Sequence, residues 1–190
     1  MKTNRKTNIY RLDFTEIKHP KEDKQPASGF IFGNPFIYAK QNYFYNLTLG
    51  FGQQYILGQK GNINGVAVSA VYNGGLAIGL LRPYYIEVFE PGGETRTIKY
   101  SQADSAAFLS TQILGGAGFG KGWNEIKIKP GAFAKAGLRF DYGRFNESVS
   151  GLEVGISAEF YGDKIPIMVA QKERQFFFQG YISVLFGRRK

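Results

Sequence analysis

The 190-residue chain contains no cysteine and a single histidine, His19. Disulfide-stapled domains, thiolate-ligated zinc or iron–sulfur proteins and enzymes with a cysteine nucleophile all require thiols, so these classes are excluded. One histidine with no cysteine cannot supply a transition-metal site, and the acidic residues Glu22, Asp23 and Asp163 are too isolated for a calcium motif. The glycine-rich segment Gly115–Gly122 lacks the Gly-Lys-Ser/Thr ending of a phosphate loop. The sequence therefore predicts no metal and no cofactor.

The chain also lacks a continuous apolar run of about 20 residues, the length that a membrane-spanning helix needs. Its longest uncharged windows, Gln41–Gln59 and Gly61–Leu81, are interrupted by Asn, Gln, Ser and Thr side chains. The segment Met1–Thr7 is basic, but the apolar segment of a secretory leader does not follow it. We therefore expect no transmembrane helix, and we expect any export signal to have been removed or lost.

Glycine and aromatic residues are abundant instead, with 25 Gly, 17 Phe and 12 Tyr but only two Met, a composition typical of β-structure. Apolar and polar residues alternate with a period of two, which predicts strands with two different faces. Seven such segments occur: Asn8–Ile17, Gln41–Gly52, Ile63–Tyr72, Leu76–Val88, Gly131–Tyr142, Gly151–Tyr161 and Gln175–Phe186. The sequence predicts a single all-β domain over residues 1–190.

Turn chemistry and connection lengths predict how these strands are joined. Asn73-Gly74-Gly75 reads as a tight hairpin turn. Counting strands from that turn places the long insertion 90–130 at one end of the sheet and the connection 19–38 at the other. In a membrane barrel these would be a long outer loop and a periplasmic connection.

Periodicity does not say which face meets water, because a soluble barrel points its apolar residues inward whereas an outer-membrane barrel points them at lipid. The polar face favours the second arrangement, since it is rich in the small residues that fit a narrow barrel interior. Aromatic residues gather near strand ends, where membrane-interface girdles lie. The candidates are Tyr10, Tyr38, Tyr43, Tyr72, Tyr84, Tyr142, Phe160, Tyr161 and Phe186. We therefore predict a small antiparallel transmembrane β-barrel of about eight strands.

Five motifs in order carry a family resemblance: His19-Pro20-Lys21-Glu22, Asn42–Tyr45, Gly75–Pro83, Glu125–Gly131 and Lys164–Met168. In this order they resemble an uncharacterised family of outer-membrane β-barrel proteins of Bacteroidota, over almost the whole chain. The resemblance implies a signal peptide and one further strand before the first strand found here. Because bacterial single-chain barrels have even strand numbers, we expect that first strand to be missing or to lie upstream of Met1.

Each face of the predicted barrel carries a candidate set of residues. The inward set is a lumen ion-pair network that fills a closed barrel, because charges in a narrow interior must pair: Arg11, Asp13, Lys135, Arg139, Asp141, Glu153 and Glu159. The outward set is predicted to face lipid: Leu47, Leu49, Val66, Val68, Leu138, Phe140, Val154, Ile156, Ile182, Val184 and Phe186. We identify no catalytic residues.

The net charge of +9 is spread over both ends of the predicted barrel, without the basic stripe and stacking platform that nucleic acid requires. Two basic rims suit lipopolysaccharide phosphates on one side and anionic phospholipid on the other. We predict a non-catalytic protein of the cell outer membrane that contacts outer-membrane lipid, lipopolysaccharide and other outer-membrane proteins or lipoproteins. It would be a structural or accessory subunit of a complex for barrel assembly, secretion or surface-lipoprotein export.

Two other functions remain open. An outer-membrane lipid-modifying hydrolase would use His19 as its base, although no nucleophile is evident beside it in the sequence. A soluble lipid-binding β-barrel would place the apolar faces inside.

Overall fold

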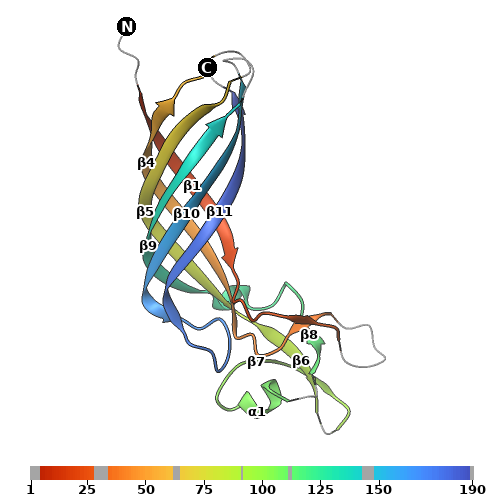
Figure 1. The fold of residues 1–190 in the computed structure, drawn as a ribbon. Helices are drawn as coiled ribbons and strands as arrows, with labels where there is room; N and C mark the ends of the chain where they lie inside the picture. The colour runs from red at the N-terminus through yellow and green to blue at the C-terminus, as the bar shows by residue number, and fades with distance from the viewer. Residues whose placement is uncertain are drawn as a thin grey trace.

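The computed structural model describes residues 5–27, 34–61, 65–90, 92–110, 113–142 and 148–188. Within these ranges one sheet contains six long antiparallel strands: β1 (Lys6–Ile17), β4 (Asn42–Gly58), β5 (Ala67–Pro83), β9 (Lys127–Asp141), β10 (Ser148–Ile165) and β11 (Arg174–Arg188). Their order in the sheet is β1-β4-β5-β9-β10-β11, so each long strand pairs with the next long strand in the chain. The strands are tilted and curl around a common interior (Figure 1).

The curl puts polar side chains inside and apolar side chains outside. On β10, Glu153 and Glu159 are at most 1 % exposed, whereas Ile156 and Phe160, on the opposite face, are 51 % and 54 % exposed. Successive residues of a strand point to opposite faces, so the period-two pattern of the sequence becomes two surfaces of opposite polarity. A barrel folded for water has the reverse arrangement.

The predicted turn at Asn73–Gly75 is wrong, because β5 runs through it without a break. Glycine is needed here for a close approach of two backbones: a Cβ at Gly75 would lie 2.1 Å from the carbonyl oxygen of Leu49 on β4. A continuous strand and a three-residue loop both leave Tyr72 and Leu76 on one face, so the alternation could not distinguish them. The seven predicted strands therefore correspond to six long strands in the large sheet.

Because β5 is continuous, the connection 19–38 is not at the end of the sheet predicted for it. It lies at the same end of the sheet as the insertion 90–130, and the prediction that the two occupy opposite ends is wrong. Backbone contacts join the segments: the Tyr84 N–H donates to the Gln41 carbonyl oxygen at 3.0 Å, and the Gln41 N–H donates to the Ile167 oxygen at 2.8 Å. We call the described parts of 18–41, 84–126 and 166–173 the loop end.

The loop end contains a second, smaller sheet, which the sequence did not predict. Its order is β7 (Thr95–Lys99), β6 (Tyr85–Phe89) and β8 (Ile113–Gly116), beside α1 (Ser105–Phe108) and the 3₁₀ turn η1 (Trp123–Glu125). Two short strands, β2 (Lys24–Gln25) and β3 (Phe36–Ile37), also pair at the loop end. The small sheet has an ordinary buried apolar core, formed by Phe36, Tyr84, Ile86, Val88, Ile98, Phe108, Ile113 and Val169. We call this unit the cap.

The large sheet does not close into the predicted eight-stranded barrel. Among the described residues β1 pairs only with β4 and β11 pairs only with β10, so each has one free hydrogen-bonding edge. We call the line between these two edge strands the seam. The molecule is all-β and antiparallel, with its large sheet rolled but open along the seam.

Candidate functional site

The rolled sheet encloses a network of charged side chains centred on Glu153, which is fully buried. Arg11 on β1 donates to Glu153 Oε1 at 2.7 Å, and Arg139 on β9 donates to Oε2 from Nη2 at 2.7 Å and from Nε at 3.0 Å. The Tyr181 hydroxyl on β11 donates to Oε1 at 2.8 Å. One carboxylate therefore joins four strands, including both edge strands.

Two further ion pairs lie in the same interior. Lys135 pairs with Asp13 of β1, and Lys60 Nζ lies 3.3 Å from Asp141 Oδ1. With Glu159, the network then comprises, among the described residues, four cationic and four anionic side chains: Arg11, Lys60, Lys135 and Arg139 against Asp13, Asp141, Glu153 and Glu159. Equal numbers of opposite charges make this burial tolerable, because an unpaired charge at low dielectric is costly.

Glu159 differs from Glu153 because the hydrogen bonds that it accepts come from uncharged groups. Gln179 Nε2 donates to it at 3.0 Å, the Tyr161 hydroxyl at 3.2 Å and the Ser157 hydroxyl at 3.5 Å. The two glutamates therefore lie on the same face of β10, but only Glu153 accepts hydrogen bonds from charged side chains.

Toward the loop end the interior becomes apolar. Phe44, Phe133, Tyr161 and Phe177 pack there with Ala77, Leu81, Ile165, Ile167 and Met168. Gly79 makes room for two of these rings, since a Cβ at this position would lie 2.7 Å from Phe44 Cε2 and 3.0 Å from Tyr161 Cε1. Tyr161 and Tyr84 were predicted as membrane-interface residues, but they are 0 % and 5 % exposed and belong to the interior and the cap respectively.

Arg82 fastens the loop end to the sheet. Its guanidinium is buried and lies 4.3 Å from the ring centre of Tyr43, 4.5 Å from that of Phe119 and 4.6 Å from that of Trp123. Nη1 also donates to the Phe119 carbonyl oxygen at 2.6 Å. A buried cation between aromatic faces is stabilising, so Arg82 holds the segment around Trp123 against β4.

Lys40 makes a second buried junction at the loop end. Its ammonium lies 2.5 Å from Glu22 Oε2 and 4.2 Å from the ring centre of Tyr43. Burial lowers the pKa of Lys40, and the hydrogen bond from Lys40 to Glu22 opposes that shift. The pair connects the segment after β1 to the start of β4.

The eleven residues predicted to face lipid all lie on the outer side of the sheet or at its margin. Eight are exposed and three are half-buried: Leu49, Val66, Leu138, Val154, Ile156, Ile182, Val184 and Phe186 in the first group, Leu47, Val68 and Phe140 in the second. The edge strands add Tyr10, Leu12 and Phe14 of β1 and Phe176 and Phe178 of β11, each at least 55 % exposed. The outer face is thus a continuous apolar surface that the interior network does not reach.

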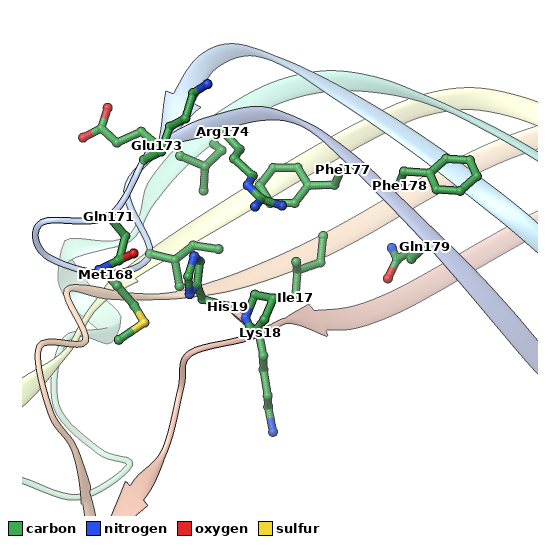
Figure 2. Close-up of a pocket in the computed structure, with 14 residues that line it drawn as sticks. Ile17, Lys18, His19, Met168, Gln171, Glu173, Arg174, Phe177, Phe178 and Gln179 are labelled. Carbon is green, nitrogen blue, oxygen red and sulfur yellow. The ribbon is translucent and has the colours of Figure 1, made fainter.

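His19 borders a cavity of about 180 Å³ between the ends of β1 and β11. Figure 2 shows Ile17, Lys18 and His19 on one side of it and Arg174 and Phe177 on the other. Its lining contains no Ser, Thr, Tyr or Cys, so the hydrolase alternative finds no hydroxyl or thiol nucleophile here. Burial lowers the pKa of His19, and the neighbouring cation Arg174 lowers it further.

Sequence reasoning named the seven charged network residues but missed Lys60, Gln54, Gln179 and Tyr181. Tyr181 and Gln179 share the polar face of β11, so alternation carried a signal for both. Lys60 follows the end of β4, where no periodicity applies. Among the described residues no group of three or more His, Asp or Glu side chains could hold a metal ion.

Comparisons of the chain with protein-family models, with curated proteins and with solved structures found no match. In the described part of the chain no helix is long and apolar enough to cross a membrane.

Proposed function

We propose that this protein is a non-catalytic β-sheet protein of the bacterial outer membrane, acting as a structural or accessory subunit of a membrane complex. The polarity of the large sheet carries the proposal. Outward side chains such as Leu12, Ile182 and Phe186 are 66–82 % exposed, while Glu153 is fully buried inside. Water disfavours that arrangement, whereas lipid favours it, because apolar surface is then buried in hydrocarbon and the polar groups pair internally.

The loop end suits an anionic membrane surface. Lys99, Lys127, Lys129 and Lys164 line a cavity of about 260 Å³ on its flank. Lys99 pairs with Glu125 and Lys129 with Asp163 at 2.7 Å. Lipopolysaccharide and phospholipid phosphates both attract such lysines, so the loop end is proposed to lie at a membrane–water interface. The sequence resemblance to outer-membrane barrels of Bacteroidota supports the same assignment.

The seam supports a subunit role. Backbone N–H and C=O groups on the free edges of β1 and β11 have no strand partner in the described residues. Each such group left unpaired in hydrocarbon costs several kcal/mol, by order of magnitude. A neighbouring polypeptide in the membrane would satisfy these edges.

Fractionation tests the membrane assignment. We expect the protein to need detergent for extraction from the outer membrane and to migrate differently on gels before and after boiling. Extraction by salt or alkali alone, with no change of migration, would contradict it.

Site-specific crosslinking tests the subunit role, and the absence of cysteine makes single-cysteine variants unambiguous. Phe14→Cys on β1 and Phe178→Cys on β11 are both on edge strands and 62–63 % exposed. Leu138→Cys and Ile156→Cys, at 44 % and 51 % exposed on the central strands β9 and β10, are the matched controls. We expect the edge variants to crosslink to one discrete protein and the central variants to remain uncrosslinked. Equal crosslinking at all four sites would argue against a partner at the seam.

A further inference from the structure

The cavity beside His19 lies at the loop-end opening of the seam. Its walls come from both edge strands and from the 166–173 connection: Ile17 ends β1 and Lys18 follows it, while Arg174, Phe177 and Phe178 begin β11. The cavity thus lies between the two edge strands, and its lining residue Phe178 is exposed on the outer face of β11.

One wall of the cavity is apolar. Ile165, Ile167 and Met168 are 2 %, 5 % and 8 % exposed, and Phe177 lies half-buried beside them. Phe178 is 63 % exposed, and its ring points away from the cavity centre in Figure 2. Apolar surface therefore continues from the cavity wall onto the outer face of β11.

The other part of the lining is cationic. Lys18, Lys172 and Arg174 line it against a single carboxylate, Glu173. Among the described residues, neither Lys172 nor Arg174 makes an ion pair. Arg174 and His19 face each other across the cavity, whereas the Lys18 ammonium points away (Figure 2).

His19 is held in one tautomer. The backbone N–H of Lys21 donates to His19 Nδ1 at 3.2 Å, so the proton of the neutral ring is on Nε2. The Lys21 ammonium donates to Gln171, another lining residue, at 3.0 Å. The cavity thus offers a guanidinium and an imidazole N–H as donors, next to an apolar wall.

We propose that this cavity binds an anionic membrane phospholipid, with its phosphate on Arg174 and His19 and an acyl chain along Ile165, Ile167, Met168 and Phe177. An arginine guanidinium binds phosphate by charge-assisted hydrogen bonds. A soluble anion would leave the apolar wall unused, and an uncharged lipid would leave Arg174 unpaired. This inference rests on the proposed membrane location.

The test uses the full chain reconstituted in phosphatidylethanolamine vesicles with or without phosphatidylglycerol. Native mass spectrometry after transfer to neutral detergent counts the retained lipid, and NMR of His19, the only histidine, reports on the site itself. Arg174→Gln removes the phosphate ligand. Lys164→Gln, near the end of β10 but in a different cavity, is the matched control.

We expect the wild type to retain one phosphatidylglycerol, with a shifted His19 signal, and Arg174→Gln to weaken retention about tenfold or more. Lys164→Gln should behave as the wild type. Equal retention in Arg174→Gln, equal loss in Lys164→Gln, or an equal His19 shift with inorganic phosphate alone would each overturn the lipid site.

Gel migration before and after boiling, measured on the same samples, separates the two proposals. A heat-modifiable protein without phosphatidylglycerol selectivity overturns only the lipid site. A protein that needs no detergent overturns the membrane location, and the cavity is then tested by titrating the soluble chain with short-chain phosphatidylglycerol. A missing His19 shift in that titration overturns the lipid site too.

Discussion

The substitution Glu153→Gln is expected to destabilise the large sheet far more than Glu159→Gln. Glu153 accepts hydrogen bonds from two guanidiniums, whose side chains are only 13 % and 16 % exposed, and from Tyr181. Glutamine would leave Arg139 buried without its anion and Arg11 with the charge of Asp13 alone, and its own N–H₂ would compete with them as a donor. Removing one partner of a buried ion pair costs about 3–5 kcal/mol of unfolding free energy.

Glu159 is the matched control because it lies on the same face of β10 and is 1 % exposed. Its three donors are uncharged: Gln179 and Ser157 donate to Oε1, which a glutamine oxygen can replace, and the Tyr161 hydroxyl at Oε2 can instead accept from the glutamine N–H₂. Removing its charge also removes the cost of burying that charge, so Glu159→Gln is expected to change the unfolding free energy by less than about 1 kcal/mol in either direction.

Urea unfolding from detergent or lipid vesicles, followed by the fluorescence of the single tryptophan, Trp123, measures both variants. A lower urea midpoint with unchanged slope would show a change of stability alone. Equal losses in the two variants would refute the reasoning, because the pairing of Glu153 with two arginines would then contribute nothing beyond burial.

Three further outcomes are expected. Gly79→Val should cost about 1–3 kcal/mol in the same urea titration, because its side chain would overlap the rings of Phe44 and Tyr161. Arg82→Met should red-shift Trp123 fluorescence, because the cation that fastens this segment to the sheet is lost. Arg174→Gln should raise the pKa of His19 toward 6.5 in an NMR titration, since a neighbouring cation disfavours the protonated ring.

Each of the three has a control on the same chain. Gly58→Ala meets no atom within 4 Å and should leave the urea midpoint unchanged. Arg96→Met removes an exposed ion pair with Glu90 and should leave Trp123 fluorescence as it is. For His19, Lys21 and Glu22 also act on the ring and remain in place, so a pKa that stays fixed in Arg174→Gln would show that burial alone sets it.

The lowered pKa of His19 determines in which direction folding stability changes with pH. A histidine whose pKa is lower in the folded than in the unfolded state binds fewer protons when folded. Stability is then expected to fall as the pH drops below about 6.5, the ordinary value, and Arg174→Gln should reduce that loss.

Alternation alone predicts the two faces of the large sheet. The residues on β10 show this most clearly, since alternation alone predicts Glu153 and Glu159 inside and Val154 and Ile156 outside. This works because a strand has a two-residue repeat whatever its partners are.

Long-range packing could not be predicted in the same way. Asn73-Gly74-Gly75 has the composition of a turn, and only the approach of the Leu49 carbonyl shows that glycine is there to let two strands come together. The cap core draws Phe36 and Val169 from segments more than a hundred residues apart, so no local pattern could have revealed it. The cavity at the seam is likewise assembled from both ends of the chain.

The cap and the large sheet impose opposite demands on a newly made chain. In water, apolar collapse would help the cap reach its native core, because that core is apolar in the usual sense. The same collapse would bury Leu12, Ile182 and Phe186 together and place the polar face of the large sheet outside. With the proposed membrane location, the chain would have to be kept from collapsing until its outer surface meets lipid, while the cap could form its core in water.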